Sequence, residues 1–320
     1  MDYAKRNILQ FGSAALLAPL VGCASKAPFR IAGHPWPGYE PIFFAESQKM
    51  LPEGVVLQHL PTIKASIDAL REGKTDGAML TLDEVLPLRL QGLDLRVILV
   101  MDVSKGADAL VTRKGIQTLS QLRGKRIGLE PSTLGELMLA MVLDRAGLKR
   151  TEVTLMPLAY EEQEAAFTKG ALDALISYEP VIGRLIAAGA QKLISTRELP
   201  DSILDVLVVR EDVAKDYVGV LQRTLRGHFL ALEQLRNNPW DTAYRMVPHA
   251  GVPAEELIES FRGLDLPDLV ANRSYLNTSN GHLLKVVKKL SDIMLAAGTI
   301  QQPVDAAQLF TDAYLPKNLE

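Results

Sequence analysis

The sequence predicts an α/β protein with two units of alternating strands and helices, followed by a helical C-terminal third. Short apolar segments alternate with helix-like segments over residues 29–101, and this alternation restarts at 109 and runs to 209. The segments after residue 212 are typical of helices. Such alternation favours mainly parallel sheets with helices on both faces. No internal sequence repeat is apparent.

We expect the first unit to contain four strands with helices between them. The expected strands are 29–33, 55–60, 77–80 and 95–101, and the expected helices are 41–50, 63–71 and 83–91. Pro41 suits the first turn of its helix, and Thr62 can cap the next one. Residues 95–101 are nearly all apolar, which is typical of a strand buried on both faces.

The second unit is expected to repeat this order, with Gly147 ending its longest helix. Its expected strands are 109–112, 125–129, 153–156, 174–176 and 206–209, and its expected helices are 133–146, 161–169 and 180–188. The C-terminal third is expected to hold helices 218–237, 240–247, 254–261 and 282–297. The pattern does not indicate which unit these last helices join.

Residues 1–22 are expected to form a lipoprotein signal peptide. Lys5 and Arg6 precede an apolar stretch, 8–20, that is too short for a membrane-spanning helix. The stretch ends in Leu20-Val21-Gly22-Cys23, which resembles the bacterial lipobox. That resemblance implies that Cys23 receives a lipid and that the chain is cut before it. The alternative is an ordinary cleaved signal peptide with an incidental cysteine.

Composition and motifs give little support to catalytic, metal-binding or nucleic-acid-binding functions. Cys23 is the only cysteine, so an internal disulfide is excluded. The formal net charge is −3, which gives no electrostatic reason to expect a nucleic-acid partner. The chain has no Gly-x-Ser-x-Gly elbow, no phosphate-binding loop and no His-Glu-x-x-His, and its five histidines are scattered. We therefore expect no enzyme, no metal and no cofactor.

Six segments resemble one protein family in order and spacing. They are Gly33-His34-Pro35-Trp36-Pro37-Gly38-Tyr39-Glu40-Pro41, Asp76-Gly77-Ala78-Met79-Leu80-Thr81-Leu82-Asp83-Glu84, Asp102-Val103-Ser104-Lys105-Gly106-Ala107-Asp108-Ala109, Leu122-Arg123-Gly124-Lys125-Arg126-Ile127-Gly128, Asp173-Ala174-Leu175-Ile176-Ser177-Tyr178-Glu179-Pro180 and Ile203-Leu204-Asp205-Val206-Leu207-Val208. Together they resemble the nitrate/sulfonate/taurine-type substrate-binding proteins of ABC importers, a family that includes thiamine-precursor binders. Tyr178 departs from the many members that carry Trp before Glu-Pro.

The resemblance implies a two-lobed type II periplasmic-binding-protein fold with a ligand held between the lobes. Lobe one would comprise residues 23–107 and 206–320, and lobe two residues 108–205. Asp108 and Asp205 would then lie near the two hinge crossings.

The candidate ligand-binding residues lie at expected strand exits and helix starts, where ligands of open α/β sheets bind. Trp36 and Tyr39 offer flat apolar surface with one polar group each, although both could simply pack the first helix. Thr81, Ser132 and Thr133 begin helices, where hydroxyl groups and free N–H groups either bind an anion or cap the helix. Asp83 is expected to favour its helix dipole as a capping residue.

Carboxylates form the second group of candidates. Asp108, Glu179 and Asp205, with Tyr178 beside them, suit a ligand that carries an ammonium group or a ring N–H. Such carboxylates would repel a bare oxyanion unless an arginine or lysine paired with them. Each of the three could instead serve the hinge or cap a helix.

The predicted function is that of a lipid-anchored binding protein, monomeric and located in the periplasm or at the cell surface. It would capture a small polar anion or zwitterion (sulfonate/taurine-, nitrate- or pyrimidine-like) for an ABC permease. The alternative is a ligand-sensing lipoprotein that regulates a membrane signalling protein. A third hypothesis, an enzyme that uses the cleft, is suggested by no grouping of residues.

Overall fold

The structure is a computed structural model, and it describes residues 26–279 and 281–320. The expected signal peptide and Cys23 lie outside the described residues. Within the described ranges, no helix is long and apolar enough to cross a membrane.

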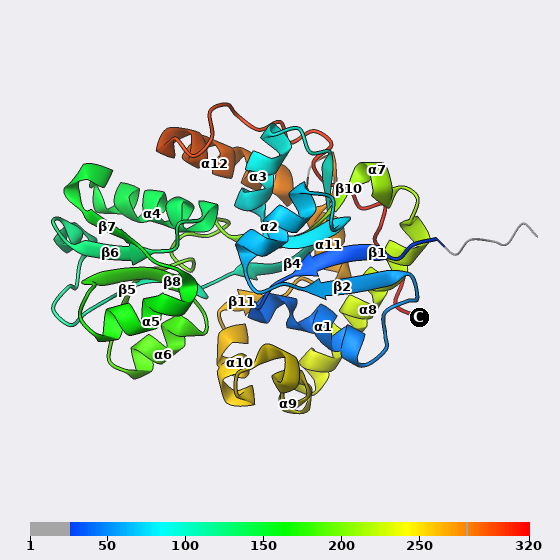
Figure 1. Cartoon of the computed structure of the whole chain (residues 1–320), viewed down its shortest axis with the longest axis horizontal. Coiled ribbons are helices and arrows are strands. Elements are labelled where there is room, and N and C mark those ends of the chain that lie inside the picture. The colour runs from blue at the N-terminus through cyan, green and yellow to red at the C-terminus, as the bar shows by residue number, and fades with distance from the viewer. Residues whose placement is uncertain (1–25, 280) are drawn as a thin grey trace, which may run out of the picture.

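Two mixed sheets form the framework of the described chain (Figure 1). The six-stranded sheet has the order β11-β4-β10-β3-β1-β2, and the five-stranded sheet has the order β7-β6-β8-β5-β9. The strands are β1 (Phe29–Gly33), β2 (Val55–His59), β3 (Gly77–Thr81), β4 (Leu95–Ser104), β5 (Asp108–Thr112), β6 (Arg126–Leu129), β7 (Thr154–Pro157), β8 (Ala174–Tyr178), β9 (Gln191–Ser195), β10 (Leu204–Arg210) and β11 (Leu264–Asp265). We call the six-stranded sheet with its helices the large unit and the five-stranded sheet with its helices the small unit.

Helices cover both sheets, which confirms the predicted α/β class. The large unit carries η1 (Pro37–Tyr39), α1 (Glu40–Ser47), α2 (Ile63–Arg71), α3 (Leu82–Leu90), α7 (Glu211–Ala214), α8 (Val218–Asn237), α9 (Pro239–Ala250), α10 (Ala254–Phe261) and α11 (Leu269–Tyr275). The small unit carries η2 (Leu119–Leu122), α4 (Thr133–Ala146), η3 (Arg150–Glu152), α5 (Tyr160–Thr168) and α6 (Val181–Ala187).

The direction of the strands follows from two antiparallel insertions. In the large unit, β10 runs antiparallel to both of its neighbours, β3 and β4, while β1 pairs in parallel with β2 and β3. In the small unit, β5 runs antiparallel to β8 and β9, while β6 pairs in parallel with β7 and β8. Most strands of each sheet therefore point the same way, as expected, and β5 and β10 are the strands that follow the two crossings between units.

The two crossings lie side by side and are hydrogen bonded to each other. The first runs from Ser104 to Asp108, and the second returns over residues 196–203. The backbone N–H of Ser104 donates to the carbonyl of Ile203 at 3.0 Å, and that of Gly106 donates to the hydroxyl of Thr196 at 2.7 Å. Gly106 has a φ of 120°, a conformation that side chains rarely adopt.

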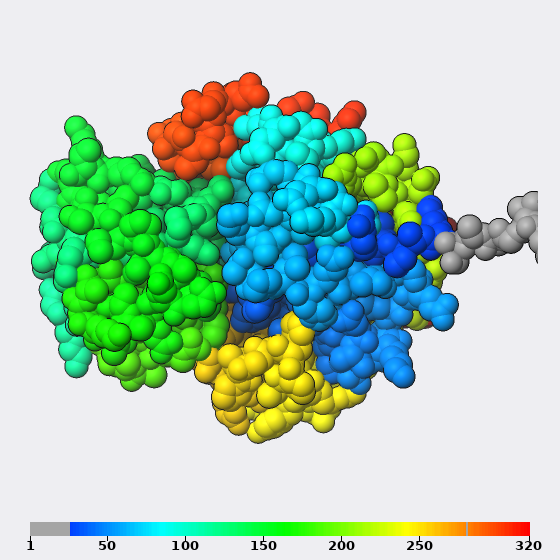
Figure 2. Space-filling model, in the orientation of Figure 1, coloured from blue at the N-terminus to red at the C-terminus, as the bar shows by residue number. Residues whose placement is uncertain are grey.

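The helix α12 (His282–Ala297) packs against both units, an arrangement that the sequence left open. It contacts α3 of the large unit and α4 of the small unit, and Figure 1 shows it lying above the junction between them. On the opposite side, α10 contacts α6. In the space-filling view, the two units are in contact in the region between α12 and α10 (Figure 2).

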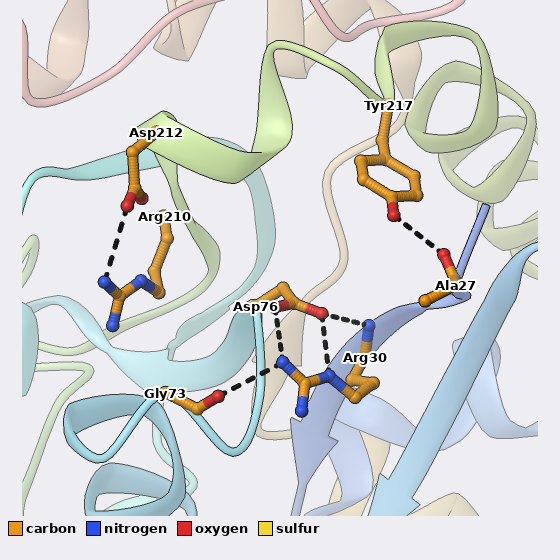
Figure 3. A network of polar contacts seen from close by, with 7 residues as sticks. All are labelled: Ala27, Arg30, Gly73, Asp76, Arg210, Asp212 and Tyr217. Atoms are coloured by element: carbon orange, nitrogen blue, oxygen red, sulfur yellow. Dashed lines mark hydrogen bonds and ion pairs between the residues drawn. The ribbon is translucent and has the colours of Figure 1, made fainter.

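Strand β1 of the large unit and strand β6 of the small unit begin with the same polar network. In the large unit, the Arg30 guanidinium donates to both carboxylate oxygens of Asp76, at 3.0 and 2.7 Å, and to the carbonyl of Gly73 at 3.1 Å (Figure 3). In the small unit, Arg126 makes the same contacts to Asp173 and to the carbonyl of Gly170, at 3.1, 3.0 and 3.1 Å. The units thus share a structural repeat that the sequence analysis did not find.

Candidate functional site

The central cavity lies between the two units at the carboxyl ends of β1, β3 and β8, and both units line it. Its lining residues are His34, Pro35, Trp36, Ile63, Thr81, Asp108, Leu134, Tyr178, Ile203 and Asp205. The cavity volume is about 20 Å³. Because about 10–15 Å³ is needed for one water, this volume is too small for an organic ligand, and the units are closed in this structure.

Strand register brings the polar lining together. Because β10 lies between β3 and β4, Asp205 is directly opposite both Thr81 and Asp102. In the small unit, Asp108 of β5 is opposite Tyr178 of β8. Each sheet therefore delivers its polar residues at the edge that faces the other sheet.

An aromatic wall crosses from one unit to the other. Trp36, which is 8% exposed, meets the ring of Tyr178 edge-on, with the ring centroids 5.6 Å apart. Tyr178 in turn stacks on Tyr160 at 4.4 Å. The Trp36 indole N–H donates to Asp102 Oδ2 at 2.9 Å. A side chain at Gly38 would collide with that same carboxylate, so glycine is required there.

Two buried carboxylates, Asp108 and Asp205, line the cavity, and a third, Asp102, lies behind Trp36 and opposite Asp205. Asp102, Asp108 and Asp205 are 0%, 2% and 3% exposed. The Tyr39 hydroxyl donates to Asp205 Oδ1 at 2.5 Å, which places Tyr39 behind the cavity wall. Asp108 Oδ2 and Asp102 Oδ1 are buried without a hydrogen-bond partner. Unsatisfied buried acceptors of this kind cost free energy, so they call for a donor.

Burial shifts the pKa values of these carboxyl groups upward. It raises the pKa of Asp108 to about 7, with the charges of Asp83 and Glu179 adding to the shift. It raises the pKa of Asp102 to about 7, although the hydrogen bond from Trp36 opposes the change. Burial and the charge of Asp102 hold the pKa of Asp205 well above its usual value. Each cause favours the protonated form of the acid.

The start of α3 adds two more buried acids. Glu84 accepts a hydrogen bond from the backbone N–H of Thr81 at 3.2 Å, so Glu84 makes the capping contact that we expected of Asp83. Both carboxylate oxygens of Asp83 and the hydroxyl of Thr81 are buried without a partner. Burial raises the pKa of Asp83 to about 7 and that of Glu84 well above its usual value.

Ser132 and Thr133 do not line the central cavity. The Ser132 hydroxyl accepts the backbone N–H of Gly135 at 3.1 Å and thus caps α4. Leu134, the next residue of the same helix, is the one that reaches the cavity. The predicted anion cradle therefore does not reach the central cavity in this structure, and the Ser132 hydroxyl lies 3.5 Å from Glu130 Oε2.

Glu179 lies at an adjoining cavity of about 210 Å³, which shares Pro35 and Trp36 with the central one. Its carboxylate accepts the backbone N–H of Gly183 at 2.8 Å. Burial raises its pKa. Arg184, Tyr160 and Leu257 also line this adjoining cavity, so it too has walls from both units.

The sequence analysis missed Asp102, His34 and Leu134. Asp102 directly follows the nearly continuous apolar segment 95–101 within β4, and an acid at such a place is a signal that could have been used. His34 is buried, and burial lowers its pKa to about 3, so the ring is neutral. Its ring packs edge-on against Tyr39.

Two of the scattered histidines converge elsewhere in the large unit. His59 Nδ1 lies 2.8 Å from His249 Nε2, and Glu46 and Glu40 accept from the outer nitrogens of this pair at 2.9 Å. These contacts form a hydrogen-bonded chain. Among the described residues, no group of three or more His, Cys, Asp or Glu is arranged to hold a metal ion.

Comparisons with known proteins place this geometry in a family. The family model described as "NMT1/THI5 like" matches residues 54–239. The taurine-binding periplasmic protein of Escherichia coli (strain K12) is 26% identical over 196 residues, 58% of each chain. A protein named "Putative binding protein" from Brucella abortus (strain 2308) is 28% identical over 79 residues, 25% of each chain. Both matches span less than two thirds of the relative's length.

Solved structures share the fold over nearly the whole chain. The periplasmic aliphatic sulphonate binding protein SsuA from Escherichia coli superposes with a TM-score of 0.73 at 18% identity, covering 89% of this chain and 92% of the other. The desulfurization enzyme DSZB superposes with a TM-score of 0.65 at 18% identity, covering 92% of this chain and 98% of the other. The predicted two-lobed binding-protein fold is confirmed. Because the family model spans more than half of the sequence, the chain belongs to the NMT1/THI5-like family.

Proposed function

We propose that this chain is an extracytoplasmic solute-binding protein that captures a small polar molecule and passes it to an ABC permease. The observation that carries the proposal is the central cavity, which has walls from both units and lies beside both crossings. Membership of the family and the likeness to the taurine-binding protein support it.

The proposed mechanism is closure of two lobes around the ligand. The proposed lobes are residues 23–107 with 206–320, and residues 108–205, with hinges near Asp108 and Asp205. Because Leu204 and Asp205 pair within the six-stranded sheet, they are assigned to the first lobe. Opening widens the central cavity to admit a ligand, and closure over the bound molecule buries it with the units held somewhat further apart than in this structure. Since α12 contacts α3 and α4, opening requires this helix to leave one of them.

The proposed ligand contacts are the residues that line or support the two cavities. Trp36, Thr81, Asp108, Tyr178 and Asp205 are assigned to the central cavity, and Glu179 to the adjoining one. Tyr39 orients Asp205 through its hydroxyl. Ser132 and Thr133 stay as predictions for contacts in the open form. Because several carboxylates lie at these cavities, binding of bare nitrate or a simple sulfonate is disfavoured. A ligand with N–H groups, whether zwitterionic or pyrimidine-like, is favoured.

The test is a thermal-shift screen with sulfonates, nitrate, amines, zwitterions and pyrimidines. A ligand that binds only the folded protein raises the melting temperature with increasing concentration. The ligand is expected to leave unchanged, so mass spectrometry after incubation should recover it intact. A complete screen without any shift would count against the proposal, and a chemically altered product would point to an enzyme.

Lipid anchoring through Cys23 is part of the proposal and has its own test. Cells that express the Cys23→Ser variant should release the protein into the soluble periplasmic or external fraction, whereas the unaltered chain should sediment with membranes. If both forms partition equally between the soluble and membrane fractions, Cys23 does not anchor the protein, and the leader is an ordinary signal peptide. Gel filtration of the detergent-solubilised protein checks the proposed monomer.

A further inference from the structure

We infer that the central cavity takes an organic cation, an ammonium or amidinium group on a small and partly apolar body, and that this cation binds in exchange for protons held by the surrounding carboxyl groups. The inference rests on the proposed function and specifies the ligand class of the same site. It departs from the sulfonates and taurine bound by the proteins to which the chain is similar.

The charges that face the cavity are acidic on every element packed around it. Among the described residues, no lysine or arginine lines the central cavity. The titratable groups that act on Asp102, Asp108 and Asp205 or stand beside them are Tyr39 of η1, Asp83 and Glu84 of α3, Glu130 after β6, Tyr178 of β8, Glu179, and the neutral His34 after β1.

The basic side chains that line the adjoining cavity or act on Glu179 already have partners. Lys192 acts on Glu179 and donates to the carbonyl of Gly106 at 3.1 Å. Arg184 is held by Glu164 and Glu256. An anion in the central cavity would therefore meet several carboxyl groups without an opposing positive charge.

The unpaired polar atoms at the cavity can each accept a hydrogen bond. Asp108 Oδ2 and the hydroxyl oxygen of Thr81 belong to lining residues that are at least nine-tenths buried, and neither atom has a hydrogen-bond partner. The donors beside them are already committed, since Trp36 N–H binds Asp102 and Tyr39 O–H binds Asp205. A ligand that brings N–H donors and positive charge would satisfy what the cavity leaves open.

The aromatic wall suits the same ligand. Trp36 and Tyr178 come from different units and meet at the cavity, so closure would bring two ring systems against a bound group. Aromatic rings attract ammonium and guanidinium groups, and they do so most strongly where water is excluded. A cavity lined by both aromatic rings and buried carboxylates is suited to bind an organic cation.

Proton exchange follows from the burial of several acids without a counter-charge. The carboxyl groups of Asp102 and Asp108 have pKa values raised to about 7, so below this pH they hold protons. A bound cation lowers these pKa values and releases protons. The affinity for a cation of fixed charge should therefore rise with pH between about 5 and 7, by up to tenfold per unit for each proton released, and level off above that range.

The experiment uses ligands of fixed charge, so that only the protein titrates. Methylammonium, acetamidinium and guanidinium, which keep their positive charge and their N–H donors from pH 5 to 8, are compared with methanesulfonate, nitrate and taurine on the full chain, by calorimetry at pH 5, 6, 7 and 8. At least one cation is expected to bind, more tightly at pH 7 than at pH 5. Calorimetry in buffers of different ionisation heat then counts the protons released.

The matched variants are Asp108→Asn and Asp144→Asn. Asp108→Asn keeps the shape of the cavity and should weaken cation binding at pH 8 by about 10- to 100-fold, the range for a hydrogen bond to a charged group. Asp144 is an exposed residue of α4, and its replacement should leave binding unchanged. Circular dichroism confirms that both variants fold.

The outcomes separate this inference from the function on which it rests. If methanesulfonate, nitrate or taurine binds and no cation does, or if cation binding is independent of pH from 5 to 8, the inference is wrong and the binding-protein function stands. If no compound of any charge binds, both fail.

Discussion

Arg184 of α6 donates from Nη1 to Glu256 of α10 at 2.6 Å, and this ion pair joins the small unit to the large unit. The same guanidinium donates from Nε to Glu164 at 2.8 Å, within the small unit. Arg184 lines the adjoining cavity, while α12 closes the opposite side by contacting α3 and α4. The closed arrangement is thus held by contacts on both flanks of the central cavity.

Replacing Glu256 with glutamine should favour the open form, because only the closed form brings this carboxylate to Arg184. A partly exposed ion pair contributes about 0.2–1 kcal/mol, so the affinity for a ligand should fall by about 1.4- to fivefold. The radius of gyration of the unliganded variant, measured by small-angle X-ray scattering, should increase.

Glu164→Gln is the control for this variant. It removes the other ion pair of the same arginine but no contact between the units. If both variants lower the affinity equally, Arg184 acts through the small unit alone and the link between units has no part in closure.

Asp173→Asn should destabilise the small unit at neutral pH. The hydrogen bond from Arg126 holds the pKa of Asp173 at about 2, below its value in the unfolded chain. This contribution is therefore complete above about pH 4 and is lost as the pH falls through 2. Because the pair is partly exposed, we expect a loss of about 1 kcal/mol at pH 7, measured by urea unfolding.

The equivalent variant in the large unit, Asp76→Asn, tests whether the repeated network contributes equally to the stability of both units. Asp76 contacts Arg30 as Asp173 contacts Arg126. Similar losses are expected from both variants, and Asp144→Asn should cost less than either. If Asp173→Asn leaves the free energy of unfolding unchanged, the backbone contacts alone fix the start of β6.

Local patterns were enough to predict most of the fold. Each of these patterns involves only a few neighbouring residues, as in the apolar segments of β4 and β8 and the helix cap at Thr62. The positions of the strands and helices could therefore be predicted from the sequence. The repeated networks escaped notice because Arg30 and Arg126 meet their partners 46 and 47 residues further along the chain. The short β9 and β11 were also missed, since their pairing depends on the neighbouring strand.

The candidate site was predicted only where a residue lies at a strand end. Trp36, Thr81, Asp108, Tyr178 and Asp205 were singled out on that basis, and the structure brings them to one cavity. That Asp102 lies beside Asp205 could not be predicted without knowing that β10 is inserted between β3 and β4. Ser132 offered the right chemistry, but its own helix occupies it through the Gly135 N–H.

Tryptophan fluorescence should report the opening of the cavity. Trp36 is 8% exposed in the closed structure, whereas Trp240 on α9 is 48% exposed. In a Trp240→Phe variant, quenching by the uncharged quencher acrylamide monitors Trp36 alone. Quenching is expected without ligand, from the open form, and should fall when a ligand closes the units. Strong protection of Trp36 both with and without ligand would mean that the protein does not open in the way proposed.

Replacing Asp108 with asparagine should stabilise the unliganded protein at high pH. The carboxyl group has a pKa of about 7 in the folded protein, above its value in the unfolded chain. Between about pH 4 and pH 7 the folded protein therefore keeps this proton, whereas the unfolded chain loses it. The wild type consequently becomes less stable as the pH rises through this range. An amide of the same shape avoids the buried charge, so the variant should be more stable by about 1–3 kcal/mol at pH 8. The difference should vanish near pH 4, where both side chains are neutral. Chemical denaturation at the two pH values measures it, and a variant less stable than the wild type at pH 8 would show that the Asp108 charge already has a stabilising partner.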